Sequence, residues 1–184
     1  MKQKLFFLAA LILQLTAIAQ NRIKFESNNQ IGLLSGTSRN VLQLQTVNGI
    51  RYKTFFVGAG IGVDNYYFKT IPLFADIRKN IFERNQTPFV YVDAGTNFPG
   101  RKDESTTWKS TSYQPGLYYD VGVGYKWKII KKLSVNASFG FSQKEYKSHE
   151  EYLYMSDPLG MPGIPPDRYY YRLQRFTMKF GLSL

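Results

Sequence analysis

The last ten residues of the chain, Arg175 to Leu184, alternate without exception between apolar side chains and polar side chains or glycine. Successive side chains of a β-strand point to opposite faces, so this segment predicts a strand with one apolar and one polar face. A strand that continues to the last residue leaves its sheet with an open edge unless the sheet closes on itself. The pattern therefore favours a closed barrel.

Residues 1–19 have the composition of a secretory signal, with an apolar run from Leu5 to Leu15 after two lysines and the small-residue cleavage site Ala17-Ile18-Ala19. The apolar run is shorter than the roughly 20 residues that a membrane-spanning helix needs. We therefore expect a mature chain that begins at Gln20 and forms one domain over residues 20–184.

Composition narrows the partners and excludes some chemistries. The formal net charge is +11, but an export signal and the scatter of the cations along the chain argue against nucleic acid. Anionic lipid headgroups and lipopolysaccharide are the expected partners. Cysteine is absent, which rules out disulfides and thiolate metal sites. Aromatic residues make up 16% of the chain, as expected of a barrel with aromatic girdles at both membrane interfaces.

Segments with a period of two recur along the mature chain, and no stretch keeps a helical period for three turns. The expected strands are 23–36, 41–52, 55–67, 71–82, 88–98, 116–129, 133–146 and 169–184. Each is long enough to cross a bilayer when tilted. The predicted fold class is all-β, an eight-stranded antiparallel up-and-down transmembrane β-barrel.

The predicted connections fall into two classes. Tight turns follow the second, fourth and sixth strands, and long loops, 99–115 and 147–168, follow the fifth and seventh. Outer-membrane barrels have this asymmetry, with short periplasmic turns and longer extracellular loops. We therefore expect a protein of the outer membrane with both termini in the periplasm.

Alternation alone does not say which face of the strands is inside, and a soluble periplasmic barrel that binds an apolar ligand is the alternative. Two features favour a membrane barrel: aromatic residues cluster at the strand ends, and the polar face is rich in glycine, serine and charges of both signs. We expect these charges to pair inside the barrel as a network of Arg51, Asp76, Arg78, Asp93, Asp120, Lys126, Arg175 and Lys179. An eight-stranded barrel is filled by its side chains, so a continuous pore is not expected.

Several segments carry a resemblance to a known group: QTVNGIRY, FFVGAGIGVD, IPLFADIRKNIF, PFVYVDAGTNFP and the terminal KFGLSL. With the signal that ends in Ala19-Gln20, they resemble small outer-membrane β-barrel proteins of Bacteroidota, which share the OmpX and OmpA architecture. The resemblance implies that the outer-membrane assembly machinery recognises the last strand, through Phe176, Phe180, Gly181, Leu182 and Leu184. The terminal residue is a leucine here, where that group usually has an aromatic residue.

Candidate chemistry is sparse, and we expect no catalytic, cofactor or metal site. The segment Gly58 to Gly62 lacks the GxGxxG spacing and a following helix, so a phosphate loop is excluded. His149, the only histidine, lies beside Ser148 and two glutamates, which leaves a lipid-modifying hydrolase as a second hypothesis. Neighbouring residues of an extended chain point apart, however, so Ser148 is poorly placed for activation by His149.

The last predicted loop carries exposed apolar residues that suit recognition of a surface partner: Tyr152, Tyr154, Met155, Leu159, Met161 and Ile164. The sequence therefore predicts a non-enzymatic barrel with a filled interior. Its expected role is structural support of the envelope or surface interaction through the two long loops.

Overall fold

The computed structural model describes residues 23–36, 39–65, 69–100, 104–106, 109–130, 132–152 and 167–184, with Tyr152 described by its backbone alone. The predicted signal peptide lies outside these residues. Among them, no helix is long and apolar enough to cross a membrane.

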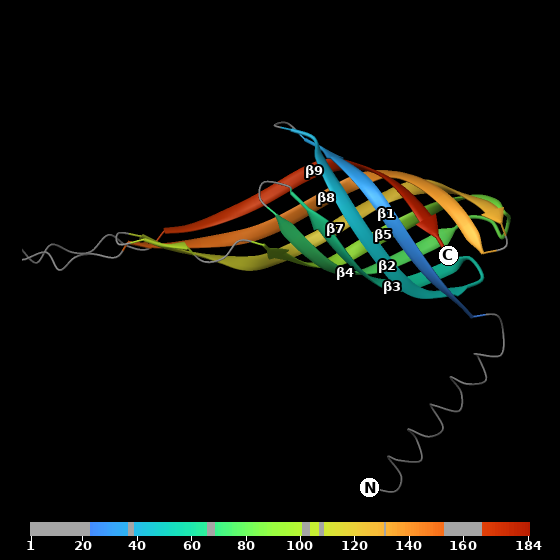
Figure 1. Cartoon of the computed structure of the whole chain (residues 1–184), viewed down its shortest axis with the longest axis horizontal. Coiled ribbons are helices and arrows are strands. Elements are labelled where there is room, and N and C mark those ends of the chain that lie inside the picture. The colour runs from blue at the N-terminus through green and yellow to red at the C-terminus, as the bar shows by residue number, and fades with distance from the viewer. Residues whose placement is uncertain are drawn as a thin grey trace, which may run out of the picture.

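The described chain forms nine strands: β1 (Lys24–Ser35), β2 (Val41–Tyr52), β3 (Phe55–Asp64), β4 (Thr70–Asn80), β5 (Gln86–Pro99), β6 (Glu104–Ser105), β7 (Lys109–Ile130), β8 (Leu133–Tyr152) and β9 (Asp167–Ser183). Every pairing is antiparallel, and eight strands form a ring in the order β1, β2, β3, β4, β5, β7, β8 and β9 (Figure 1). The two-residue β6 pairs with β7 only and lies outside the ring. The predicted fold class is confirmed.

The first and last strands close the ring. Ile31 lies opposite Phe180 and Leu33 lies opposite Met178, which is the pairing that the alternation of the terminal strand requires. Beyond the last residue of β9, Leu184 still exchanges two backbone hydrogen bonds with Ser27, of 2.8 and 2.9 Å. The terminal strand therefore has a partner on each side along the barrel, and its edge is covered there.

The strands β7, β8 and β9 extend beyond the ring, past the ends that the sequence predicts. The segments Lys109–Pro115 and Lys147–Tyr152, which we expected in long loops, belong to β7 and β8 and pair with each other. β9 begins at Asp167 and pairs with this part of β8, so a three-stranded sheet continues beyond the ring (Figure 1). The added segments lack alternating apolar residues because they lie outside the apolar belt of the barrel, so the period-two signal is missing.

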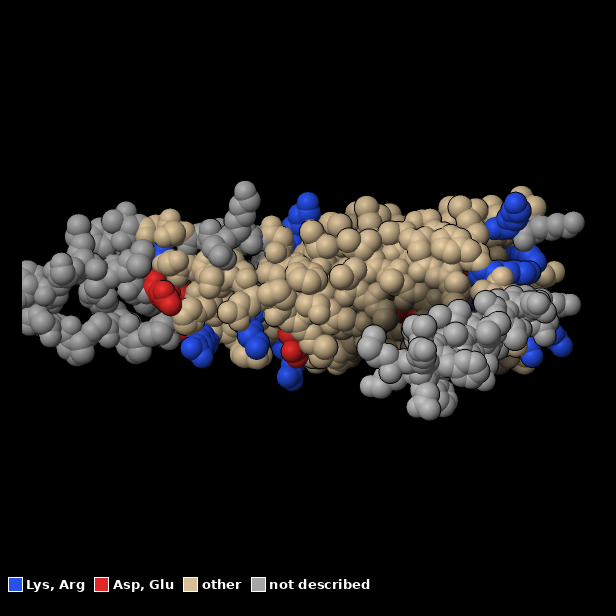
Figure 2. All heavy atoms as spheres, turned by 90° about the horizontal axis from the view of Figure 1, so that it is seen from below, with Lys and Arg blue, Asp and Glu red and all other residues tan. Residues whose placement is uncertain are grey.

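Side chains alternate between the wall and the interior of the barrel, apart from two irregularities in the β7–β8 ladder. Outward apolar residues are about half exposed, for example Phe180 at 55% and Val123 at 59%. In Figure 2 the charged side chains gather toward the ends of the molecule, and the wall between them is largely uncharged. The inward residues are mostly polar, charged or glycine, and many are fully buried. An apolar wall around a polar interior is the arrangement of a transmembrane barrel.

Two neighbouring strands approach closely at a glycine pair. Gly49 lies opposite Gly58, and a Cβ atom on Gly49 would lie 2.2 Å from the carbonyl oxygen of Val57. The clash is with backbone, which has no rotamer to move away. At Gly32, in contrast, an added Cβ would lie 3.3 Å from side-chain atoms of Gln43 and Lys179, and the backbone oxygen of Met178, at 3.5 Å, would be in ordinary van der Waals contact.

We expect Gly49→Ala to lower the free energy of unfolding by roughly 1–3 kcal/mol, because the β2–β3 ladder must shift to admit the methyl group. Gly32→Ala is the matched control and should cost clearly less, because flexible side chains can move. Urea unfolding of both variants in lipid vesicles measures the difference. Equal losses for the two variants would contradict the close backbone contact.

Candidate functional site

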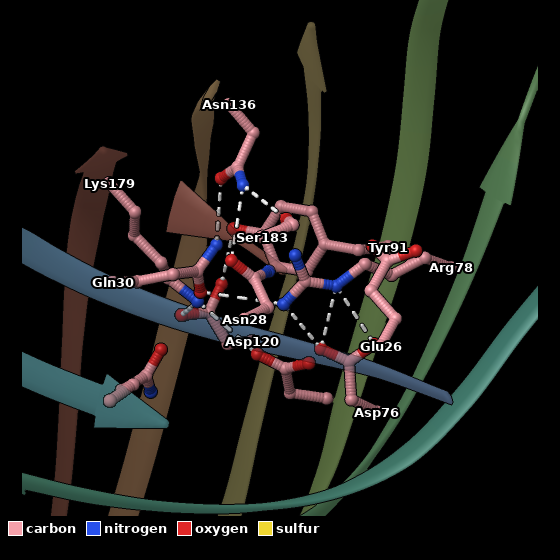
Figure 3. Close-up of polar contacts among 12 residues, drawn as sticks. Glu26, Asn28, Gln30, Asp76, Arg78, Tyr91, Asp120, Asn136, Lys179 and Ser183 are labelled. Atoms are coloured by element: carbon pink, nitrogen blue, oxygen red, sulfur yellow. Dashed lines mark hydrogen bonds and ion pairs between the residues drawn. The ribbon is translucent and has the colours of Figure 1, made fainter. Parts of the chain in front are cut away.

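The interior of the barrel is a packed set of polar and aromatic side chains, drawn in part in Figure 3. Its middle holds a group that we call the central cluster, made of Asp76, Arg78, Tyr91, Asp93, Asp120 and Lys179. All three carboxylates of this cluster have no solvent exposure, and Lys179 is 1% exposed.

The strand register sets the chemistry of the central cluster. Asp76 on β4 lies directly opposite Asp93 on β5, and Asp93 lies directly opposite Asp120 on β7. Directly opposed residues of an antiparallel pair have Cβ atoms roughly 5 Å apart, so three carboxylates form one row across the inner wall. Like charges at this spacing repel strongly inside a protein, and the row needs cations beside it.

Two cations meet the row from different directions. Lys179 extends from β9, and its Nζ lies 2.8 Å from Asp120 Oδ2 and 3.2 Å from Asp93 Oδ2. Arg78 is on the same strand as Asp76 and donates to that carboxylate from Nε at 2.8 and 2.9 Å and from Nη2 at 2.5 Å. The row is thereby held from β4 and from β9, which lie in different parts of the ring.

Neutral groups add hydrogen bonds to the central cluster. The Tyr91 hydroxyl donates to Asp120 Oδ1 at 2.8 Å, and Arg78 Nη2 donates to Gln30 Oε1 at 3.4 Å. Gln30 in turn donates to Asn136 Oδ1 at 3.1 Å, as Figure 3 shows. These contacts link β7 to β5, and β4 to β1 and β8, through the interior of the ring.

Two smaller ion-pair groups lie on either side of the central cluster. Near the end of the barrel that carries the β2–β3 turn, Glu26 accepts from Arg51 and from Lys126, the latter at 2.8 Å. Toward the opposite end, Asp64 accepts from Lys144 and from the Thr70 hydroxyl, the latter at 2.7 Å. The lumen therefore has paired charges at three levels.

Aromatic rings occupy the space between these levels. Phe56, Phe74 and Tyr118 are buried and pack with Val47, and the rings of Phe74 and Tyr118 meet edge to face at 5.2 Å. Glycines on neighbouring strands make room for these rings: a Cβ on Gly60 would lie 2.5 Å from the ring of Phe74. The glycines of the Gly58 to Gly62 segment thus serve the packing of the interior.

The structure places seven of the eight predicted lumen charges in these groups. Arg175, the eighth, lies at the rim and donates to the backbone carbonyls of Leu34 and Arg39, at 3.5 and 2.5 Å. Sequence reasoning left Glu26, Asp64 and Lys144 out of the network. Each has the parity of the polar face in its strand, and this signal was sufficient to find them.

The arrangement of Ser148 and His149 in the structure does not support the hydrolase hypothesis. Ser148 is 4% exposed, and the His149 ring nitrogen Nε2 lies 3.0 Å from Glu151 on the same strand. Ser112 faces His149 across the ladder, but no hydrogen bond joins the two side chains. Within the described residues, no group of three or more histidine, aspartate or glutamate side chains is arranged to hold a metal ion.

The other predicted site residues lie on the wall or outside the described part. Phe176, Phe180, Leu182 and Leu184 are exposed on the outer wall, and Gly181 faces inward beside Gln30 and Asn136. Of the six loop residues proposed for surface recognition, Tyr152 has only its backbone described. Tyr154, Met155, Leu159, Met161 and Ile164 lie outside the described residues.

The three-stranded sheet beyond the ring has an edge along β9 that no strand of the described residues covers. Leu184 exchanges both backbone hydrogen bonds with Ser27, so the even-numbered residues of this strand direct their peptide groups toward β1. The β1 ladder ends where Ser35 meets Phe176. Beyond that point, Tyr170, Arg172 and Gln174 direct N–H and C=O groups away from β8, and no strand of the described chain pairs with them.

Comparison with solved structures places this barrel among known architectures. Neisserial surface protein A aligns over 88% of this chain and 96% of its own, with a TM-score of 0.54 and 9% sequence identity. A major outer membrane protein from Thermus thermophilus aligns over 87% of this chain and 98% of its own, with a TM-score of 0.44 and 12% identity. No family model and no curated protein matches the sequence. At 9% identity, the likeness to the neisserial protein shows the fold alone.

We expect Lys179→Met to lower the free energy of unfolding by roughly 3–5 kcal/mol, because two fully buried carboxylates lose their shared cation. Lys126→Met is the matched control: Glu26 keeps Arg51, and the pair is partly exposed, so the loss should stay within about 1 kcal/mol. Urea unfolding in vesicles measures both variants. Comparable losses of unfolding free energy in the two variants would show that the central cluster contributes no more to stability than the Glu26 group.

Proposed function

We propose that this chain is a non-enzymatic outer-membrane barrel that presents a protruding sheet for interaction outside the cell. The proposal includes both termini in the periplasm and places the β7–β8–β9 sheet on the extracellular side. It also includes membership in the Bacteroidota group that its segments resemble. The single observation that carries the proposed role is the open β9 edge at Tyr170, Arg172 and Gln174.

The filled interior supports a role outside the barrel. Ion pairs at three levels and the rings of Phe56, Phe74 and Tyr118 occupy the bore, which leaves the described interior no open path for ions or substrates. Eight-stranded rings have an interior just wide enough for side chains. The surfaces that remain for function are the outer wall, whose apolar side chains suit contact with lipid, and the two ends of the barrel.

The protruding sheet has the chemistry of a strand-recognition surface. A free strand edge accepts another extended chain through backbone hydrogen bonds, and side chains on alternating positions add specificity. Tyr170 is 69% exposed, and Lys147 Nζ lies 4.8 Å from the centre of its ring. Arg172 is also exposed and pairs with Glu145. Exposed tyrosines such as Tyr170 are among the residues that most often dominate protein interfaces, whereas the Arg172 side chain is already engaged by Glu145.

The outer wall of the barrel suggests the other partners that we propose, which are membrane lipids, lipopolysaccharide and the assembly machinery. Its half-exposed apolar side chains suit lipid chains, and the basic excess suits the anionic headgroups of lipopolysaccharide. The outward Phe176, Phe180, Leu182 and Leu184 with Gly181 remain the segment that we propose for recognition by the outer-membrane assembly machinery.

We expect Arg172→Pro to reduce adherence of expressing cells severalfold, because proline removes an edge N–H that points away from β8 and leaves the β8 ladder intact. Arg172→Ala keeps the backbone donor and is the matched control. A deletion strain complemented with each variant is measured for adherence to protein-coated surfaces and for detergent resistance.

The proposed role requires that Arg172→Pro and the deletion reduce adherence while Arg172→Ala leaves it near the wild-type level. A deletion strain that adheres normally would overturn the surface role. If that strain loses only its detergent resistance, the role lies in the integrity of the envelope.

A further inference from the structure

The apolar wall contains a group of outward polar side chains on β1 and β2. Asn29 lies opposite Thr46, and Ser27 lies opposite Asn48. All four have the outward parity of their strands, and both asparagines are exposed. We call these four residues the polar island.

The polar island lies within the apolar belt. Ile31 and Leu44 follow it toward one end of the barrel, and Phe25 and Ile50 follow it toward the other. The neighbouring strands also present apolar residues, with Leu182 opposite Asn29 and Ile61 opposite Thr46. Asn48 is four residues from Tyr52 at the end of β2, roughly 13 Å along the strand. The island therefore faces hydrocarbon when the barrel spans a membrane.

Its hydrogen bonding is incomplete. The Thr46 hydroxyl donates to Asn29 Oδ1 at 2.8 Å, which fixes the Asn29 amide and leaves its Nδ2 group directed elsewhere. No described side chain or backbone group bonds Asn29 Nδ2 or the amide of Asn48. An amide that faces hydrocarbon without a partner is costly, because lipid chains offer no hydrogen bonds.

The wall is also hollowed at this place. A groove of about 660 Å³ crosses β3, β2, β1 and β9, with the Asn29–Thr46 pair in it and Ile61, Val63, Phe180 and Leu182 among its lining. The groove offers a contact surface that combines apolar walls with hydrogen-bonding groups. Association within membranes relies on close packing and on such polar groups.

We propose that the polar island is the contact surface of a homodimer, with a second copy of this chain as the occupant. Two copies inserted in the same direction are related by a twofold axis along the membrane normal. Each residue then contacts the partner at the same depth in the membrane, so the polar island of one copy faces the polar island of the other. A primary amide carries both a donor and an acceptor, so two identical asparagines can satisfy each other. Because the polar island can form hydrogen bonds with an identical island, a second copy is favoured over a lipid chain, which has no hydrogen-bond donors.

The inference uses the membrane placement of the wall and is independent of the role of the β9 edge. The chain contains no cysteine, so single cysteines report contacts without background. Ile31→Cys lies beside the island at 50% exposure, and Val92→Cys on β5, on the other side of the ring, is the matched control at 48%. Oxidation in native membranes should give a covalent dimer from Ile31→Cys, at least tenfold above that from Val92→Cys.

The polar groups are then removed in the Ile31→Cys background by Asn29→Leu with Asn48→Leu. We expect about a tenfold weaker dimer, the effect of losing on the order of two hydrogen bonds in a membrane. Heat-modifiable gel mobility confirms that this variant still forms a barrel. Leucine suits the lipid-facing wall, so folding should be retained.

Three results would overturn the dimer. Equal cross-linking from Ile31→Cys and Val92→Cys would indicate random collision. Unchanged cross-linking in the leucine variant would remove the role of the amides. Energy transfer is also measured between labelled cysteine-free chains at a low protein-to-lipid ratio, where the proposal expects it to persist. A fall to zero would show that the protein is a monomer and that lipid covers the groove.

Discussion

The row of three aspartates across β4, β5 and β7 is the constraint on which the rest of this barrel depends. Asp76, Asp93 and Asp120 are buried side by side, and such a row is stable only with cations against it. Lys179 supplies one from the last strand, which pairs with the first and closes the ring. The strand that closes the barrel therefore also carries the lysine that neutralises the aspartates, so β9 must be in place for both.

This arrangement is the basis for proposing that function lies at the surface of the barrel. Side chains that neutralise the aspartates also fill the bore, with Phe56 and Phe74 between the charged levels. What remains accessible is the wall, where the Asn29–Thr46 pair breaks the apolar surface, and the sheet that carries β7, β8 and β9 beyond the ring. In the described part of the chain the interior side chains are buried, so both proposals concern the outside of the barrel.

Alternation was enough to predict the ring of strands and their faces, because each wall position such as Val121 or Val123 differs in polarity from its neighbours. It could not predict the aspartate row, since the register that brings Asp76 and Asp120 beside Asp93 is a property of paired strands. The extension of β7 was missed because Lys109–Pro115 has no apolar period. Arg175 was placed inside by parity alone, but it lies at the rim, within reach of the backbone carbonyls of Leu34, near the end of β1, and of Arg39.

The central claim is that paired charges and aromatic rings close the interior to ions, so that this barrel acts through its surfaces. Planar-bilayer recording of the purified protein tests it most directly. The account predicts a baseline without steady conductance steps at either polarity, under conditions in which a porin inserted in the same bilayer conducts. Stable, reproducible steps from the pure protein would contradict it and would require an open path past Arg78 and Lys179.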